Sequence, residues 1–212
     1  MDATVTVTDI ETVGPDTVAI EFETPETFDA HPGQFVKLSA EIDGEEYARF
    51  YTLSSPDVIG TFEITVGIDP DESGPFSDYL VGLSAGDEIA MSGPFGSDYY
   101  EGESRVIVLA GGPGVGPAVG IGERAINDGG ELAIIYKDAD PAHKDRLSTL
   151  DAAGASLVIT GGSITEAVDA AVTGADDEQI FVYGFADFVD EATAAVEAAG
   201  VDSDELKVEN FG

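Results

Sequence analysis

Hydrophobic and polar residues alternate along the first hundred residues in the manner of short β-strands. Six segments show this period of two or are rich in β-branched and aromatic residues, and Gly, Pro and Asp separate them at short intervals. These segments are residues 4–8, 17–24, 34–40, 46–54, 61–68 and 87–94, and one helical stretch, 76–83, interrupts them. The pattern predicts an antiparallel β-barrel or sandwich.

The pattern changes at residue 105. Continuous apolar runs at 105–111, 131–137, 156–160 and 179–184 alternate with helical patterns such as 117–126 and 188–199. This alternation predicts a parallel sheet flanked by helices. We therefore expect two domains, residues 1–100 and 101–212, with the joint near 96–104. The chain opens on a strand pattern rather than a signal peptide, and no apolar run approaches the roughly 20 residues that span a membrane, so we expect a cytoplasmic protein.

The charge is strongly one-sided, with 43 Asp and Glu against 8 Lys and Arg and a net charge of −35. The acids are spread through the chain, which favours a solvated surface of the halophilic type, suited to a salt-rich cytoplasm. The alternative is an acidic face that docks a basic partner. Nucleic acid is not an expected partner because phosphate binding needs clustered Lys and Arg.

Cysteine is absent and only two histidines are present. Disulfides, a cysteine nucleophile and a cysteine-ligated iron–sulfur cluster are therefore excluded from these 212 residues, and we expect no metal site.

Three short motifs carry candidate chemistry. In residues 110–120 a glycine-rich turn, Gly111-Gly112-x-Gly114-x-x-Pro117, follows the first buried run and could hold a dinucleotide pyrophosphate or could serve tight packing. In "GPFSDYL", residues 74–80, Ser77 occupies an expected helix N-cap, which indicates either a capped helix that plugs a barrel or a second anion site. In "RFYTLSS", alternation puts Arg49 and Tyr51 on one face of a strand and Phe50 and Thr52 on the other. Arg49 and Tyr51 could bind a phosphate and stack on a flat ring, or they could form an ordinary Arg–Tyr pair on the surface.

Five segments in this order resemble the ferredoxin–NADP reductase superfamily, and in particular its compact bacterial and archaeal flavin reductases without a fused iron–sulfur domain. They are "PGQFVKL" (32–38), "RFYTLSSP" (49–56), "GPFSDYL" (74–80), "SGPFG" (92–96) and "AGGPGVGP" (110–117). The resemblance covers nearly the whole chain. It implies a Greek-key antiparallel β-barrel that binds FAD, followed by a Rossmann-like nucleotide domain.

The resemblance also implies roles for individual residues. Arg49 would pair with the flavin phosphate, Tyr51 would stack on the isoalloxazine ring and Thr52 would lie near flavin N5. The implied FAD-binding set is Arg49, Phe50, Tyr51, Thr52, Val66, Gly67, Ile68, Gly74, Pro75, Phe76 and Ser77. The implied NAD(P)-binding set is Gly111, Gly112, Gly114, Pro117, Lys137, Asp138 and Gly184, and the implied catalytic set is Tyr51, Thr52, Glu209 and Phe211.

Two segments depart from the family pattern. The family's Cys-Gly-Pro segment is Tyr183-Gly184-Phe185 here, and Pro113 replaces a residue that is often Thr. The ending "KVENFG" resembles that of relatives whose last residues approach the flavin, although a final strand that only packs the domain would explain it equally well.

The coenzyme preference depends on the segment after the second buried run. A 2′-phosphate calls for Arg or Lys, and a free ribose 2′-hydroxyl calls for Asp or Glu. Lys137, Lys144 and Arg146 compete with Asp138 and Asp140 here, and the adjacent acids favour NADH over NADPH.

These features predict an FAD-dependent NAD(P)H oxidoreductase. It would pass a hydride between nicotinamide and FAD and then single electrons to a separate acceptor such as ferredoxin. The alternatives are a non-catalytic flavin-holding subunit of a larger complex, a reductase of free flavin, ferric chelates or quinone, and a nucleotide-binding protein without flavin. We expect a monomer or a weak homo-oligomer.

Overall fold

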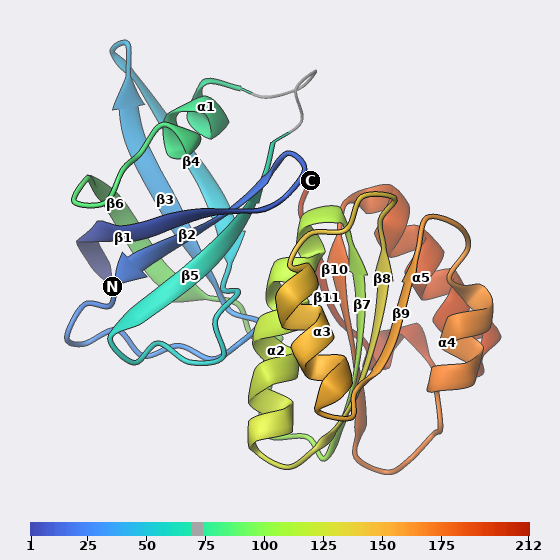
Figure 1. Cartoon of the computed structure of the whole chain (residues 1–212). Coiled ribbons are helices and arrows are strands. Elements are labelled where there is room, and N and C mark those ends of the chain that lie inside the picture. The colour runs from blue at the N-terminus through green and yellow to red at the C-terminus, as the bar shows by residue number, and fades with distance from the viewer. Residues whose placement is uncertain (69–73) are drawn as a thin grey trace.

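The first domain is an antiparallel β-barrel (Figure 1). The computed structural model of the chain describes residues 1–68 and 74–212. The barrel strands are β1 (Asp2–Gly14), β2 (Thr17–Glu23), β3 (Phe35–Ile42), β4 (Glu45–Thr52), β5 (Thr61–Gly67) and β6 (Glu88–Phe95). Their order is β4-β3-β6-β1-β2-β5, and a bridge between Leu53 and Ile64 brings the end of β4 against β5. The predicted Greek-key barrel is confirmed.

The alternation of apolar residues builds the core of this barrel. Paired strands β2 and β5 place Ile20 opposite Ile64 and Phe22 opposite Phe62, and all four side chains are fully buried. The two phenyl rings are stacked with centroids 5.2 Å apart. Because successive strand residues face opposite sides, the polar residues between them face outward.

Helix α1 (Pro75–Val81) closes one end of the barrel by burying Phe76 and Leu80 in its core. The expected N-cap at Ser77 is wrong. The helix begins at Pro75 after the cap residue Gly74, because proline already has the helical φ angle and lacks the amide that a cap would satisfy. Ser77 therefore lies within the first turn.

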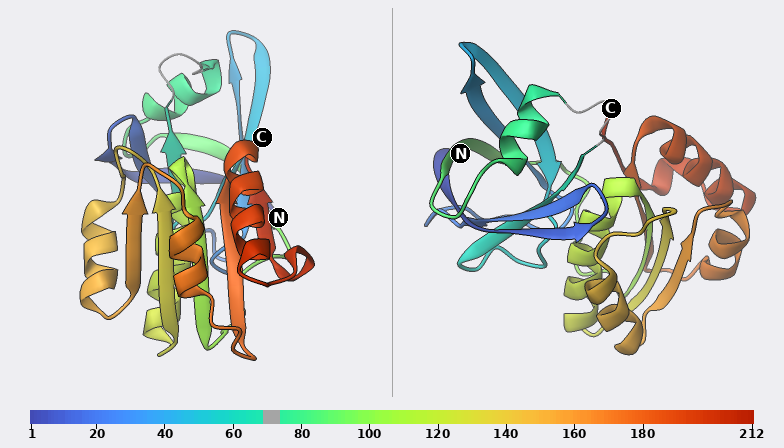
Figure 2. Two further views of the ribbon diagram at one scale, coloured as in Figure 1. Left: turned by 90° about the vertical axis from the view of Figure 1, so that its right-hand side faces the viewer. Right: turned by 45° about the horizontal axis from the view of Figure 1, so that its top comes forward.

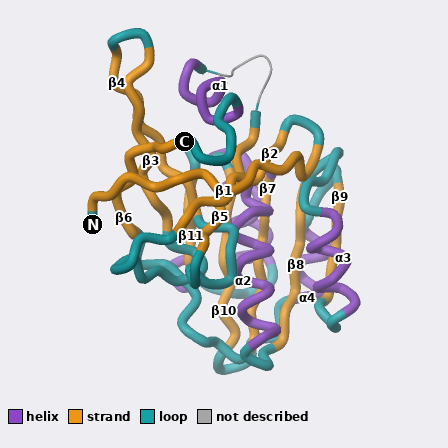
Figure 3. The backbone as a smooth tube through the Cα atoms, turned by 60° about the vertical axis from the view of Figure 1, so that its left-hand side comes forward, coloured by secondary structure: helices purple, strands orange, loops and turns teal. Residues whose placement is uncertain are grey.

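The second domain is a parallel sheet with helices on both faces (Figure 2). Its strands are β7 (Arg105–Gly111), β8 (Glu131–Lys137), β9 (Ser156–Thr160), β10 (Glu178–Gly184) and β11 (Lys207–Asn210), in the order β11-β10-β7-β8-β9. Its helices are α2 (Val115–Asn127), α3 (Lys144–Ala152), α4 (Thr165–Ala171) and α5 (Ala186–Ala198), with short 3₁₀ turns at Gly112–Gly114 and Ser203–Glu205. Loops join the two sheets (Figure 3).

Each face of the parallel sheet has its own core. Val106, Val108 and Ala110 of β7 pack with α2 and α3, whereas Ile107 and Leu109 pack with α4 and α5. Burial on both sides explains the continuous apolar runs of β7, β8 and β10, whereas the edge strand β9 is more exposed. Within the described residues, no helix is long and apolar enough to cross a membrane.

Helix α2 also lies against the barrel. A Cβ atom added at Gly116 would lie 2.6 Å from Thr65 Oγ1, and one added at Gly120 would lie 2.9 Å from the backbone of Ser54. These glycines, one helical turn apart, let the helix approach the barrel closely, so that the loops at the carboxyl ends of the parallel strands face β4 and β5.

Candidate functional site

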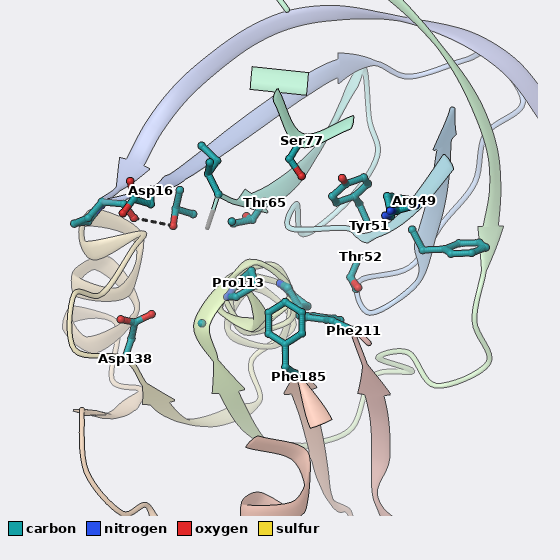
Figure 4. A pocket seen from close by; sticks show the side chains of 17 residues that line it. Asp16, Arg49, Tyr51, Thr52, Thr65, Ser77, Pro113, Asp138, Phe185 and Phe211 are labelled. Atoms are coloured by element: carbon teal, nitrogen blue, oxygen red, sulfur yellow. Dashed lines mark hydrogen bonds between the residues drawn. The ribbon is translucent and has the colours of Figure 1, made fainter. Parts of the chain in front are cut away.

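A cleft of about 730 Å³ lies between the two domains, and side chains from both line it (Figure 4). Its position outside the carboxyl ends of parallel strands is where ligands bind in open α/β sheets. The lining residues are Pro15, Asp16, Thr17, Arg49, Phe50, Tyr51, Thr52, Thr65, Gly67, Ile68, Ser77, Gly112, Pro113, Pro117, Asp138, Phe185 and Phe211.

Strand β4 supplies the polar and aromatic wall of the cleft. Tyr51 is partly buried, and this burial raises the pKa of its phenol to about 12 although the nearby charge of Arg49 opposes the shift. The phenol therefore stays protonated at neutral pH. Arg49 is exposed and donates a hydrogen bond from Nη1 to the carbonyl of Ala48 at 2.8 Å, and Ser77 faces the same space from α1.

Thr52 and Glu209 meet across the domain boundary. The Thr52 hydroxyl donates a hydrogen bond to Glu209 Oε1 at 2.9 Å, and Thr52 is only 6% exposed. Burial raises the pKa of Glu209 to about 7, the Thr52 hydrogen bond opposes this, and the negative charge of Asp98 adds to it. The pair places a carboxyl group that titrates near neutrality beside the cleft.

The turn after β7 gives its glycines two different environments. Gly112 has a positive φ of 53° and lines the cleft, and a Cβ there would meet no atom within 4 Å. Gly111 and Gly114 are packed instead, because a Cβ would lie 2.4 Å from Phe188 Cγ and 2.2 Å from the Tyr183 carbonyl oxygen respectively. The turn therefore presents backbone to the cleft at Gly112 and packs tightly on either side.

A second hollow of about 450 Å³ shares Gly112, Asp138 and Phe185 with the cleft. Lys137, at the end of β8, forms an ion pair with Glu191 of α5. The remaining lining residues are Gly111, Ala139, Gly161, Asp187 and Phe188.

The structure brings most of the residues predicted from the sequence to these two hollows. Those in the cleft or the second hollow are Arg49, Phe50, Tyr51, Thr52, Gly67, Ile68, Ser77, Gly111, Gly112, Pro117, Lys137, Asp138 and Phe211. Glu209 joins them through Thr52. Outside both linings lie Val66 and Phe76, which are buried in the barrel core, together with Gly74, Pro75, Gly114 and Gly184.

Tyr183 lies where the family pattern has cysteine. Its side chain is 1% exposed, is absent from the lining of both hollows, and its hydroxyl has no hydrogen-bond partner among the described residues. A Cβ at Gly33 of the barrel would lie 2.7 Å from that hydroxyl, so Tyr183 fills space between the domains. Phe185, which is 53% exposed, faces the cleft instead and meets Phe211 edge to face with centroids 6.0 Å apart.

Several lining residues have no signal in the local sequence. Thr65 is an ordinary strand residue whose hydroxyl is paired with His143 Nε2 at 2.8 Å, and Asp16 lies in the β1–β2 turn. Glu191 lies midway along a helix with several other acids. Only the packing of distant segments brings these three residues to the site.

Residues 4–100 match the family model of the oxidoreductase FAD-binding domain. The glycine betaine monooxygenase reductase subunit of Chromohalobacter salexigens is 44% identical over 99 residues, which are 44% of this chain and 26% of that protein. The toluate 1,2-dioxygenase electron transfer component of Pseudomonas putida is 33% identical over 128 residues, 57% of this chain and 37% of that protein. The matched part thus spans about a third of these relatives or less.

Over the whole chain, the fold is similar to that of a solved reductase. A ferredoxin NADP⁺ reductase from Neisseria gonorrhoeae, solved with bound FAD and NADP, superposes with a TM-score of 0.80 at 16% identity and covers 100% of this chain and 99% of that one. The family match of the barrel agrees with the resemblance seen in the motifs. The parallel-sheet domain and the cleft between the two domains agree with it as well. Residues 4–100 therefore match the oxidoreductase FAD-binding domain, and the whole chain has the fold of solved reductases such as the ferredoxin NADP⁺ reductase.

Proposed function

We propose that the chain is an FAD-dependent NAD(P)H reductase that passes electrons to a separate acceptor. The observation that carries the proposal is the single cleft in which the β4 motif, the glycine turn and the C-terminal residues come together. These three segments come from different parts of the chain. Each of them fits a chemical group that such a reductase must bind.

The residues of the cleft fit FAD. The volume of about 730 Å³ lies within the usual range for a cofactor pocket, and its wall combines an aromatic ring, a guanidinium and several hydroxyls. Gly112 offers backbone to the cleft without a side chain in the way. A flat ring system with phosphates needs this combination of a stacking surface, a cation and exposed amides.

FAD, when bound, supplies hydride acceptance from a nicotinamide and single-electron release to an acceptor. Arg49 would hold its phosphate through a planar fork of donors, and Tyr51 would cover the ring. Thr52 orients Glu209, which can hold or release a proton near neutral pH. Phe185 and Phe211, which meet edge to face in the cleft, would line the nicotinamide side.

At the nucleotide end, the 111–114 turn would carry the pyrophosphate of NAD(P)H and Asp138 would face its ribose. Gly111 and Gly114 hold the turn against Phe188 and Tyr183, so that Gly112 keeps its open position. Gly74, Pro75 and Phe76 would set the position of Ser77 at the flavin end, and Val66 and Gly184 would support the walls from behind.

The acceptor we propose is a ferredoxin or another small redox protein, because the chain has no cysteine with which to hold its own iron–sulfur cluster. A flavin-holding subunit without catalysis, and a reductase of free flavin, ferric chelates or quinone, use the same cleft. The excess of 43 acids over 8 bases supports a salt-rich cytoplasm as the setting and a monomer or weak homo-oligomer as the state, since the copies repel one another.

The test is an absorbance spectrum in molar salt after addition of FAD, repeated anaerobically with NADH and NADPH. A flavin band that bleaches with a nicotinamide supports the reductase. A band that neither coenzyme bleaches would leave a flavin-holding subunit, and the absence of any flavin binding would refute the proposal.

Arg49→Ala should weaken FAD binding about tenfold or more, because one charge-assisted contact to phosphate is lost. The matched control is Lys37→Ala, a cation on the neighbouring strand β3 that does not line the cleft. Fluorescence titration measures both affinities. Equal flavin affinity in wild type and Arg49→Ala would show that Arg49 does not bind the cofactor.

A further inference from the structure

The second hollow has an unusual balance of charge. Its charged lining residues are Lys137, Asp138, Asp187 and Glu191, that is, three carboxylates and one ammonium. Two of the acids, Asp187 and Glu191, lie four residues apart on α5 and therefore on one face of the helix. The hollow shares Gly112 and Asp138 with the cleft, so it is the continuation of the site toward the nucleotide end.

The one ammonium in this hollow is already paired. Lys137 Nζ donates to Glu191 Oε2, and each side chain of this ion pair is 31% exposed. Arg146, which the sequence also offered as a phosphate ligand, lies elsewhere and is bound to Glu63, Glu123 and the carbonyl of Ser54. Among the residues that the structure describes, the lining of the hollow therefore contains no cation that is free of a carboxylate.

Asp138 is held in place beside this pair. Its Oδ2 accepts from the Tyr136 hydroxyl at 3.1 Å and its Oδ1 accepts from the Asp140 amide at 2.8 Å. A fixed carboxylate accepts hydrogen bonds from a ribose diol, whereas a 2′-phosphate of about two negative charges would meet it with repulsion.

We propose that Glu191 determines coenzyme specificity by occupying Lys137, so that the site takes NADH and rejects the 2′-phosphate of NADPH. This inference rests on the proposed function and deepens it. Glu191 acts through Lys137 rather than by contact with the coenzyme. Without the Glu191 carboxylate, Lys137 would be free to pair with a 2′-phosphate, because a lysine ammonium is a compact charge on a flexible stem.

Glu191→Gln tests the proposal through binding and turnover. Calorimetric titration with ADP and with adenosine 2′,5′-bisphosphate, at one fixed salt concentration, measures the affinity of the nucleotide site independently of flavin. We expect the affinity for the 2′-phosphorylated ligand to rise about tenfold relative to ADP, as for one charge-assisted hydrogen bond. The kcat/KM ratio of NADPH to NADH should rise in parallel.

Two variants isolate the role of the ion pair. Asp187→Asn removes one negative charge from the same helix face and hollow but leaves Lys137 paired, so it should give much less than the tenfold change. Adding Lys137→Met to Glu191→Gln should abolish the gain. An Asp187→Asn gain equal to that of Glu191→Gln, or no gain in Glu191→Gln while ADP binds normally, would overturn the inference. Failure of the wild-type protein to bind ADP would instead overturn the nucleotide site of the proposed function, and the inference with it.

Discussion

The environment of Glu209 does not follow from its position in the sequence. It lies in the short strand β11, next to the C-terminus, yet its carboxylate meets Thr52, 157 positions earlier in the chain. Burial raises its pKa to about 7, so the folded protein binds a proton there more readily than the unfolded chain does. This difference makes the stability of the protein depend on pH.

Glu209→Gln should remove that dependence. The raised pKa means that the favourable contribution is complete below about pH 4.5, the ordinary pKa of the group, and is lost as the pH rises to about 7. Above pH 7 the wild type should therefore carry a cost of about 3 kcal/mol, because one pKa unit corresponds to about 1.4 kcal/mol. Glutamine cannot ionise, so urea unfolding at a series of pH values should show a flatter profile for the variant between pH 4.5 and 7.

Asp98→Asn provides the companion measurement. The negative charge of Asp98 raises the pKa of Glu209, so its removal should move the stability loss to lower pH without abolishing it. The same pH profile in wild type and Glu209→Gln would show that Glu209 is not the titrating group.

At the scale of elements, helix α2 joins the two domains through its glycines. The open position at Gly112 belongs to the turn before the helix, whereas Gly116 and Gly120 face the barrel. The sequence showed all of these glycines as one glycine-rich stretch, residues 110–120. Only the structure separates a glycine that opens onto the cleft from glycines that allow helix–barrel contact.

Local pattern predicted the elements well for a physical reason. Strands β7 and β8 coincide with the apolar runs of the sequence because both of their faces are buried, and the barrel strands follow their alternation. Strand β9 coincides with its run as well, although it is an edge strand in which Val158 and Ile159 are 37% and 40% exposed. The motif residues also reached the cleft because each motif carries its own strand and turn. Contacts such as Thr52 with Glu209 and Lys137 with Glu191 depend on the packing of distant segments, which no local pattern specifies.

The substitutions Gly120→Ala and Gly112→Ala should therefore have different effects, the first mainly on stability and the second mainly on nucleotide binding. At Gly120 a Cβ would lie about 3 Å from the backbone of Ser54 and Ser55, so we expect a loss of about 1 to 3 kcal/mol in the free energy of unfolding from overpacking. At Gly112 the strain of a positive φ costs about 1 kcal/mol, while the new methyl group projects into the cleft and weakens ADP binding. Thermal unfolding and calorimetry distinguish the two. A Gly120→Ala protein of unchanged stability would mean that α2 does not need its close contact with the barrel.

At the scale of the whole molecule, two of the few cations of this acidic chain, Lys207 and Arg146, connect separate acidic segments. Lys207 ties β11 to the carbonyl of Tyr99 and to Glu101 and Glu103 in the segment between the domains. Arg146 ties Glu63 of the barrel to Glu123 of α2. Since the chain carries a large excess of acidic residues, each of these cations reduces the repulsion between two acidic segments that pack together.

The joint around Arg146 is largely removed from water. The Arg146 side chain is 24% exposed, and its guanidinium donates hydrogen bonds of 2.6 to 2.8 Å to Glu63, Glu123 and the Ser54 carbonyl. Burial works against its charge, but the two carboxylates more than offset this and raise its pKa. Beside it, burial and the charge of Arg146 lower the pKa of His143 to about 3, so His143 stays neutral and Arg146 is the cation of the joint.

Arg146→Gln should uncouple the two domains. It leaves two carboxylates facing one another across the boundary, and the loss of a buried partner of this kind costs about 3 kcal/mol or more. We expect two unfolding transitions in place of one and a larger radius of gyration in X-ray scattering. High salt should restore only part of the contact, because screening acts weakly on groups removed from water.

Arg124→Gln is the matched control, since its pair with Asp128 is 42% and 39% exposed and should contribute less than about 1 kcal/mol. Adding Glu63→Gln and Glu123→Gln to Arg146→Gln removes the repulsion and should restore a single transition. If the triple variant stayed as open as Arg146→Gln, the domains would be held by the hydrogen bonds of Arg146 rather than by its balance of charge.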